Sequence, residues 1–218
     1  MPTTVKENYL KAIYFIDEEE GRISVTELSK RLEVSKPTAS SMMKSLEEQG
    51  WVVYQKYKPL KLTEKGRKAA AKIIRKHRLT EMFLYEVMGF GWEEVHEIAE
   101  QMEHIQSEKL FARMDEILNY PTVDPHGSPI PDEKGNISKP EYVPLTSLTD
   151  GQRVQLCALA HSSEDLLRYL NELNIHLGTV IHILKTEPFD HSILMSCDEK
   201  APILISEKVG NSLLVKPL

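Results

Sequence analysis

The chain has little cysteine and no long apolar run, and both absences narrow what it can be. Cys157 and Cys197 are its only cysteines among 218 residues, and they form no C-x-x-C pair. Neither a disulfide framework nor a zinc knuckle is indicated. No apolar stretch reaches the roughly 20 residues that cross a bilayer, and the N-terminus lacks the apolar core of a secretion signal. We therefore expect a protein of the reducing cytoplasm that does not contact membranes.

The net charge of −6 disfavours nucleic-acid binding when it is taken alone, but the charges are unevenly distributed. Residues 1–78 contain 17 Lys+Arg and 10 Asp+Glu, a charge of +7, whereas the other 140 residues contain 10 and 23, a charge of −13. Charge can vary by chance along a chain. The size of this difference favours a basic nucleic-acid module joined to an acidic module with another task.

The first part of the chain has the pattern of a helix-turn-helix followed by a β-hairpin. Apolar residues recur at three- and four-residue spacing over residues 4–19, and Gly21 ends this helix. A second helix opens at Ser24, and a third opens at Lys36-Pro37, where proline suits the first turn. The β-prone runs 51–54 and 60–62 predict the two strands of a wing.

The rest of the chain predicts two long helices, a linker and a small β domain. Residues 63–88 and 92–118 are each expected to form one helix, separated by Gly89 and Gly91. Six of the twelve prolines fall between Pro121 and Pro144, which is typical of a linker or extended connector. Beyond it, strands are expected at 154–159, 179–184, 192–197, 202–205 and 212–215, with a helix at 163–173.

We therefore expect a mainly α protein with a small β domain, arranged as three consecutive domains. Residues 1–70 form a winged helix-turn-helix DNA-binding domain. Residues 71–140 form a helical dimerisation and metal-binding domain that ends in the Pro-rich linker. About five short strands and one helix in residues 141–218 are most simply assembled as an SH3-like β-barrel.

Small polar residues at the start of the third helix are the type that contacts base edges in the major groove. Lysines of the wing are expected to contact phosphates, which adds affinity that depends on salt. The candidate DNA-binding residues are Ser35, Lys36, Pro37, Thr38, Ser40, Ser41, Lys44, Lys56 and Lys58, with Lys61 as a further wing lysine. The alternative is a winged helix that binds protein, which the charge of +7 disfavours.

One recognition helix covers only a few base pairs, so a two-fold homodimer on a palindromic operator is expected. The two long helices have more apolar residues than the core of one small domain needs. This excess favours a dimer contact on these helices. A core within one chain is the alternative. The candidate dimer residues are Leu79, Met82, Phe83, Val87, Met88, Ile98, Ile105 and Leu110.

Two clusters of possible metal ligands lie on the long helices. His77 and Glu81 are four residues apart and so project from one face. On one continuous helix, residues 96, 100, 103 and 104 would fall within a stripe about 100° wide; they are His96, Glu100, Glu103 and His104. Exposed helix faces often carry such residues without a metal, but their density favours one. Nitrogen and oxygen ligands without thiolate suit Mn²⁺ or Fe²⁺, with Zn²⁺ or Co²⁺ still open.

The whole chain resembles the diphtheria-toxin-repressor family, and specifically its manganese-transport-regulator branch. The segments that carry the resemblance are Glu7-Asn8-Tyr9-Leu10-Lys11-Ala12-Ile13-Tyr14, Ser35-Lys36-Pro37-Thr38, Leu62-Thr63-Glu64-Lys65-Gly66, Arg75-Lys76-His77-Arg78-Leu79-x-Glu81, Val95-His96-x3-Glu100-x2-Glu103-His104 and Pro125-His126-Gly127-Ser128-Pro129-Ile130-Pro131. Each segment alone is weak evidence, and together they are specific.

The resemblance implies two neighbouring metal ions per subunit. One ligand set would be His77, Glu81 and His96, and the other Glu100, Glu103 and His104. Glu100 stands where the iron-responsive branch has cysteine. The C-terminal domain lends a ligand in some members, for which Glu164 or Asp165 is the nearest candidate.

Two positions depart from the manganese branch. Asn8 stands where that branch has aspartate, and an amide oxygen is a weaker ligand for a dication. Lys11 replaces a glutamate of some manganese sensors.

These observations favour a repressor, not an enzyme, that binds operator DNA when Mn²⁺ is bound; control of metal-uptake genes is implied by the resemblance alone. An Fe²⁺-responsive repressor of the same family is one alternative. A regulator that needs no metal and whose barrel binds a protein is another. A di-metal hydrolase is the third, although no separate nucleophile or acid accompanies the clusters.

Overall fold

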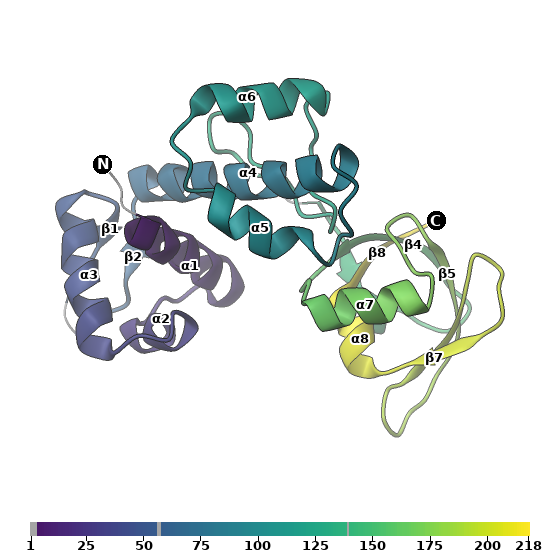
Figure 1. The fold of residues 1–218 in the computed structure, drawn as a ribbon. Coiled ribbons are helices and arrows are strands. Elements are labelled where there is room, and N and C mark those ends of the chain that lie inside the picture. Colours follow the sequence, from purple (N-terminus) through teal and green to yellow (C-terminus); the bar gives the residue numbers. More distant parts are fainter. Residues whose placement is uncertain (1–3, 56–57, 139) are drawn as a thin grey trace. The chain divides into compact units, whose positions relative to one another are not determined.

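The computed structural model describes residues 4–55, 58–138 and 140–218, which divide into two compact units. The first unit comprises Met1–Thr80, Ala99–Tyr120 and Ile130–Ser138. The second comprises Glu81–Ile98, Pro121–Pro129 and Lys139–Leu218. Figure 1 labels the elements along the chain. Among the described helices, none has the length and apolar character that would let it cross a membrane.

The winged helix-turn-helix forms as expected in the first unit. Its helices are α1 (Thr4–Glu20), α2 (Val25–Arg31) and α3 (Lys36–Glu48). Side-chain oxygens of Ser24 and Ser35 cap α2 and α3 by accepting hydrogen bonds from backbone N–H groups in the first turn. The antiparallel wing strands β1 (Val52–Val53) and β2 (Lys61–Leu62) are shorter than expected, and a bridge between Ile23 and Leu60 adds to them.

The two long helices predicted from periodicity become three. Helix α4 (Glu64–Glu86) agrees closely with the expected 63–88. The single helix expected over 92–118 is wrong, because the chain forms α5 (Val95–Met102) and α6 (Glu108–Ile117) instead. Ser107 breaks the continuity: its side chain accepts a hydrogen bond from the backbone N–H of Leu110 and starts a new helix. Glu103 and His104 therefore lie in the turn after α5 and not within a helix.

Among its described residues the Pro-rich segment forms no helix, and its only strand is at its end, Val143–Pro144, but it is not a solvated linker. Asp124 and His126 are buried, and Val123 bridges Pro129 in the second unit. Ile130 is buried in the first unit, where the guanidinium of Arg75 also donates to the carbonyl of Pro131 at 2.6 Å. Sequence composition indicated the lack of regular structure correctly but missed the packing.

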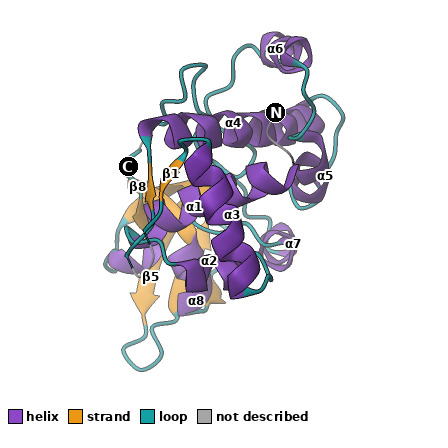
Figure 2. Ribbon diagram, turned by 90° about the vertical axis from the view of Figure 1, so that its left-hand side faces the viewer, coloured by secondary structure: helices purple, strands orange, loops and turns teal. Residues whose placement is uncertain are grey.

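The second unit contains a six-stranded antiparallel sheet with the order β3-β8-β4-β5-β6-β7. Figure 2 shows its strands in orange. The five expected strands are present, and the sheet also contains the unexpected β3. The strands are β3 (Val143–Pro144), β4 (Arg153–Leu159), β5 (Val180–Thr186), β6 (Ile193–Cys197), β7 (Ile203–Ile205) and β8 (Leu213–Pro217).

Helix α7 (Glu164–Glu172) forms where a helix was expected, whereas the 3₁₀ turn η1 (Leu145–Ser147) and helix α8 (Glu207–Ser212) were not expected. Helix α8 is short and contains Gly210, which masks any helical pattern. The apolar core of this unit includes the inward-facing residues Leu156, Ile181 and Met195. The expected fold class, mainly α with a small C-terminal β domain, is confirmed.

Candidate metal and DNA-binding sites

His77 and Glu103 form a buried pair in the first unit. His77 lies on α4, and its Nδ1 is 2.7 Å from Oε2 of Glu103 in the turn after α5. The Glu103 side chain is fully buried. Glu100, one turn earlier on α5, places Oε1 3.9 Å from the same Nδ1. Ligand-type atoms of these three residues all lie within 4.8 Å of one another, as a metal group requires.

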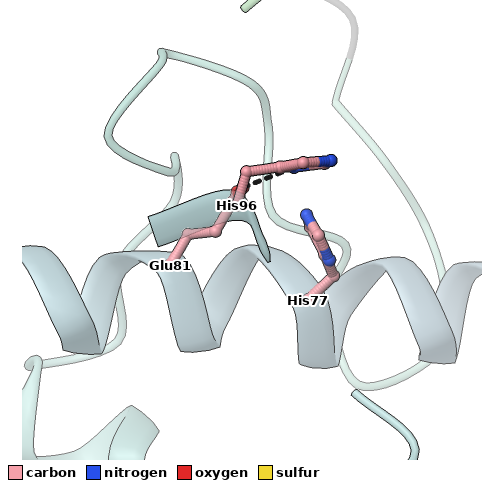
Figure 3. A group of neighbouring side chains, drawn as sticks. All are labelled: His77, Glu81 and His96. Atoms are coloured by element: carbon pink, nitrogen blue, oxygen red, sulfur yellow. Dashed lines mark hydrogen bonds and ion pairs between the residues drawn. The ribbon is translucent and has the colours of Figure 1, made fainter. Parts of the chain in front are cut away.

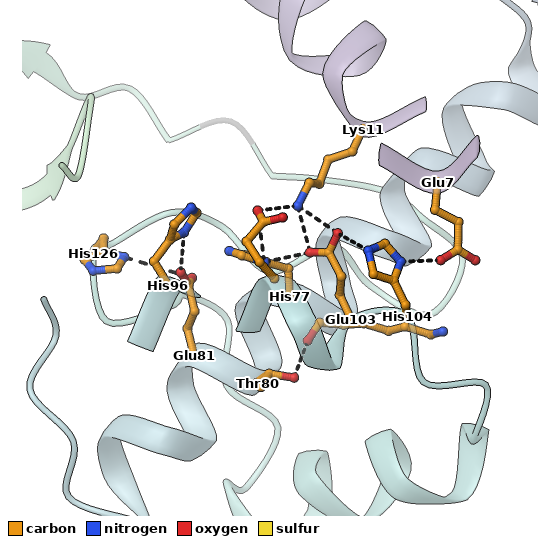
Figure 4. A network of polar contacts seen from close by, with 11 residues as sticks. Glu7, Lys11, His77, Thr80, Glu81, His96, Glu103, His104 and His126 are labelled. Atoms are coloured by element: carbon orange, nitrogen blue, oxygen red, sulfur yellow. Dashed lines mark hydrogen bonds and ion pairs between the residues drawn. The ribbon is translucent and has the colours of Figure 1, made fainter. Parts of the chain in front are cut away.

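The ammonium of Lys11 on α1 lies within this group (Figure 4). Its Nζ is 2.6 Å from Oε1 of Glu100 and 2.8 Å from each carboxylate oxygen of Glu103. The Lys11 side chain is only 12% exposed, so this is not a solvated surface ion pair. Carboxylates predicted to hold a metal ion are thus already paired with a protein cation.

His104 and Glu7 form a second link between α1 and the turn after α5. Nδ1 of His104 is 2.6 Å from Oε2 of Glu7, whose other oxygen accepts a hydrogen bond from Gln106 at 3.1 Å. Nε2 of His104 lies 3.6 Å from Oε1 of Glu103. Helix α1 of the winged helix is therefore joined to the candidate ligands through both Glu7 and Lys11.

Opposing effects act on the pKa of Glu103. Burial alone would raise the pKa, because desolvation disfavours the charged form. The hydrogen bond with His77 and the charge of Lys11 outweigh burial and hold the pKa of Glu103 below its ordinary value. Glu103 is therefore a carboxylate at neutral pH, as a metal ligand must be.

Asn8 contains an unsatisfied acceptor. Its Oδ1 is buried and has no hydrogen-bond partner among the described residues. A buried acceptor without a donor is costly, and a bound cation is one way to satisfy it. Asn8 is on the same helix as Lys11, three residues before it.

In the second unit, Glu81 on α4 pairs with His96 on α5. Oε1 of Glu81 is 3.2 Å from Nδ1 of His96. Glu81 is 2% exposed, whereas the side chain of His96 is 54% exposed. Figure 3 shows Glu81 and His77 extending from the same side of α4, as their spacing predicts. The boundary between the units falls after Thr80, so His77 belongs to the first unit, and Glu81 and His96 belong to the second.

His126 and Asp124 adjoin Glu81 and were not predicted as site residues. Nδ1 of His126 is 4.0 Å from Oε2 of Glu81, and Nε2 is 2.8 Å from the carbonyl oxygen of Trp92. Asp124 accepts hydrogen bonds from the backbone of His126 and Ser128. Glu81, Asp124 and His126 form another buried group with possible ligand atoms within 4.8 Å. The segment around His126 contributes to the family resemblance, which gave this residue no role.

Glu164, the predicted ligand from the C-terminal domain, lies in the first turn of α7. Its carboxylate pairs with Arg168 at 2.6 Å, and its side chain is 54% exposed. It belongs to none of the groups of possible ligands found among the described residues. The α7 residue that does reach the segment before α5 is Asn171, whose Oδ1 accepts a hydrogen bond from the indole of Trp92 at 2.8 Å.

The predicted DNA-reading residues lie on the solvent side of α3. Its buried side consists of Ala39, Met43 and Leu46, so helix periodicity turns the polar residues outward. Ser40 is half-buried, and the exposed members of the set are Ser35, Lys36, Pro37, Thr38, Ser41 and Lys44. The Ser35 hydroxyl accepts a hydrogen bond from the N–H of Thr38 at 3.2 Å, which engages it in the helix cap.

A surface hollow of about 610 Å³ adjoins the start of α3. Lys36, Ser40 and Lys58 line it, and so does Arg22, which precedes α2 and was not predicted. Lys56 lies outside the described residues, and Lys61 is exposed on β2. The hollow therefore combines cations from the segment before α2, from α3 and from the wing.

The chemistry of the two ligand sets differs. His77, Glu81 and His96 offer nitrogen and oxygen atoms, and the buried carboxylate of Glu81 fits a cation. The cysteines stand apart, on β4 and β6, and join no group of possible ligands among the described residues. The second set does not fit a dication as it stands, because Lys11 pairs with Glu100 and Glu103.

Three family models match successive parts of the chain. Residues 1–60 match the N-terminal DNA-binding domain of iron-dependent repressors, and residues 63–132 match their metal-binding and dimerisation domain. Residues 143–217 match the FeoA domain. The iron-dependent repressor IdeR of Mycobacterium leprae is 35% identical over 181 residues, which cover 78% of this chain and 79% of that protein.

The chain belongs to the iron-dependent repressor family. The diphtheria toxin repressor of Corynebacterium diphtheriae is 31% identical over 188 residues, which cover 82% of this chain and 83% of that protein. IdeR of Mycobacterium tuberculosis is 42% identical over 125 residues, and this match spans 57% of the chain and only 54% of that relative.

Similar solved structures include a manganese-dependent repressor and a regulator with bound Cd²⁺. A manganese-dependent transcriptional repressor in complex with manganese has a TM-score of 0.88 and 33% identity, covering 98% of this chain and 100% of the other. ScaR with bound Cd²⁺ has a TM-score of 0.81 and 31% identity over 100% of both chains. The expected resemblance to the diphtheria-toxin-repressor family is confirmed, and manganese-dependent repressors are among the similar solved structures.

Proposed function

We propose that this repressor-family protein binds operator DNA when Mn²⁺ is bound and thereby controls genes for metal uptake. The observation that carries the proposal is the buried carboxylate of Glu81 beside the imidazoles of His96 and His126, in a chain whose N-terminal part forms a winged helix with an exposed polar recognition helix. Nitrogen and oxygen ligands suit Mn²⁺ and also Fe²⁺, and the iron-dependent relatives keep Fe²⁺ as the second candidate.

His77, Glu81 and His96 are the residues proposed to hold the metal ion tightly. His77 and Glu81 share one side of α4, and Glu81 already lies 3.2 Å from His96 on α5. The ion would supply the positive charge that keeps these side chains together. Glu81 and His96 join α4 to α5 within the second unit. Within the first unit, His77 pairs with Glu103 in the turn after α5, which α1 also contacts.

The resemblance implies a second ion held by Glu100, Glu103 and His104, with Asn8 as a further ligand. The unsatisfied Oδ1 of Asn8 supports a cation nearby. The ammonium of Lys11 opposes it, because it pairs with both glutamates. Glu164 is not retained as a proposed ligand, since its exposed carboxylate pairs with Arg168.

Operator recognition is assigned to α3 and the cations around it. The exposed hydroxyls of Thr38 and Ser41 are proposed to meet base edges, and Lys44 lies one turn further along the same exposed side. Lys36, Lys58 and Arg22 line the adjoining hollow and are proposed to contact phosphates. Phosphate contacts set position and affinity, whereas base contacts set sequence preference.

The functional form is proposed to be a cytoplasmic homodimer. Apolar residues at the end of α4 and beyond remain exposed, including Tyr85 at 42%, Val87 at 48% and Met88 at 58%. Leu79, which was expected to join the dimer contact, is 1% exposed and belongs to the core. An exposed apolar patch of this kind suits the self-complementary surface of a two-fold dimer.

Operator affinity measured at fixed salt with and without metal tests the proposal. We expect Mn²⁺ to strengthen binding strongly, the chelator to reverse the effect, and His96→Ala to abolish it. Parallel titrations with Fe²⁺ and Zn²⁺ identify the preferred ion. Equal affinity with and without metal would favour the regulator that needs no metal.

We propose a regulator and not a di-metal hydrolase. A hydrolase would leave the basic winged helix without a task, and the ligand glutamates are engaged with Lys11 and the histidines. Turnover of a phosphate ester by the Mn²⁺-loaded protein, lost in His96→Ala, would favour the enzyme instead.

A further inference from the structure

Lys11 lies where the second metal ion is expected from the ligand set. Its ammonium contacts three carboxylate oxygens, one on Glu100 and both on Glu103, at 2.6 to 2.8 Å. The ammonium donates hydrogen bonds to Oε1 of Glu100 and Oε2 of Glu103, and its contact with Oε1 of Glu103 is an ion pair. Figure 4 shows the side chain reaching from α1 into the group.

Burial makes this contact different from an ordinary lysine–glutamate pair. The side chain of Lys11 is 12% exposed and that of Glu103 is fully buried. Exposed ion pairs are screened and worth little, whereas a buried carboxylate without a cation is unstable. Glu103 therefore requires positive charge, and Lys11 provides it without a metal ion.

A dication on the same carboxylates would have to lie within a few ångströms of the ammonium. Like charges at that separation repel strongly in a buried site. The two cations therefore compete for Glu100 and Glu103, and the one that is covalently attached is always present at high effective concentration.

We propose that Lys11 is a built-in cation that replaces the second metal ion. The inference rests on the proposed function, because it supposes that the chain binds a metal ion at His77, Glu81 and His96. Lys11 then joins α1 of the winged helix to α5 permanently, as a positioning residue. Each subunit responds to a single ion and not to two.

Metal stoichiometry of the full-length protein tests this inference. Wild type, Lys11→Arg, Lys11→Met and Lys11→Glu are dialysed against Mn²⁺, and bound manganese is measured by elemental analysis. We expect about one ion per chain for wild type and Lys11→Arg, which keep the charge. Lys11→Met and Lys11→Glu should bind about two, because Glu100, Glu103, His104 and the Oδ1 of Asn8 are then available.

Lys68→Glu is the matched control, because Lys68 is an exposed lysine on α4 that pairs with Glu64. It should bind one ion, as wild type does. Electron paramagnetic resonance gives an independent readout: Lys11→Glu and Lys11→Met should show magnetic coupling between two Mn²⁺ ions, and wild type the spectrum of isolated ions. Thermal unfolding establishes whether each variant is folded. If Lys11→Glu does not fold, Lys11→Met alone provides the test.

Two ions bound to wild type, or one ion bound to folded Lys11→Glu and Lys11→Met, would overturn the inference and leave the proposed repressor intact. If neither wild type nor any variant binds an ion, the proposed function is overturned. The role of Lys11 as a substitute ion is then overturned as well.

Discussion

Nε2 of His126 lies 2.8 Å from the carbonyl oxygen of Trp92, while Nδ1 of the same ring faces Oε2 of Glu81 at 4.0 Å. A carbonyl accepts only, so Nε2–H of His126 donates this hydrogen bond. The ring is 2% exposed and stacks on Trp92. One buried imidazole thus connects a proposed ligand with the backbone that precedes α5.

Replacing His126 should weaken both the fold and metal binding. His126→Phe keeps the ring but loses the hydrogen bond to Trp92, which should lower the free energy of unfolding by about 1–3 kcal/mol. Loss of a residue that supports a ligand typically weakens metal affinity by about 10- to 100-fold. Chemical denaturation and calorimetric titration with Mn²⁺ measure the two effects. The exposed His161, changed to Phe, is the control, and equal results for both variants would rule out this role.

Gly127 and Gly151 form a matched pair that tests whether the Pro-rich segment packs closely against β4. Both have φ of +84°, but a Cβ at Gly127 would lie 2.3 Å from the carbonyl oxygen of Cys157, whereas one at Gly151 meets nothing within 4 Å. We expect Gly151→Ala to cost about 1–2 kcal/mol of unfolding free energy and Gly127→Ala clearly more. Similar losses in thermal or urea unfolding would mean that the segment is not packed there.

Lys36 should contribute affinity without sequence preference. Removing a single phosphate contact reduces the slope of log affinity against log salt by about 1. Lys36→Ala is therefore expected to weaken binding to operator and unrelated DNA by the same factor. Fluorescence anisotropy at several salt concentrations measures the slope, with the exposed Lys208→Ala on α8 as the control. A loss confined to operator DNA would instead mean that Lys36 reads bases.

Cys197 should react slowly with thiol reagents. It is 5% exposed, and burial, with the neighbouring charge of Asp198, raises its pKa to about 11. At pH 8 only about one thiol in a thousand is then ionised, and the rate should rise about tenfold per pH unit up to that pKa. Alkylation followed by mass spectrometry of the peptide that contains Cys197 measures the rate. Rapid modification of the folded protein at pH 8 would contradict the burial.

Local sequence signals sufficed for most of the fold because they act over a few residues. Ser35 and Pro37 define the start of α3, and alternating apolar residues define most strands of the sheet. The helix expected over 92–118 was wrong because periodicity was followed through Ser107, although a serine three residues before Leu110 is itself a capping signal. Short elements such as α8 have too few residues to produce a pattern.

The candidate ligands could be selected by type and spacing, but their pairing could not. Lys11 and Glu100 are 89 residues apart, and nothing local relates them. The departure at Lys11 was visible in the sequence, whereas its consequence depends on α1 lying beside the turn after α5. His126 was hidden in a Pro-rich segment that composition assigned to a linker. The contacts of Lys11 and of His126 both depend on packing between residues that are far apart in the sequence.

Reciprocal coupling tests the central claim, that metal binding and operator binding stabilise the same arrangement. If Mn²⁺ tightens operator binding by some factor, operator DNA must tighten Mn²⁺ binding by the same factor, and such couplings are typically about 5- to 150-fold. Mn²⁺ affinity measured by calorimetric titration with and without saturating operator provides the value. We predict tighter Mn²⁺ binding on operator DNA and no change on unrelated DNA at the same salt. Identical Mn²⁺ affinity in the presence and absence of operator would contradict the account.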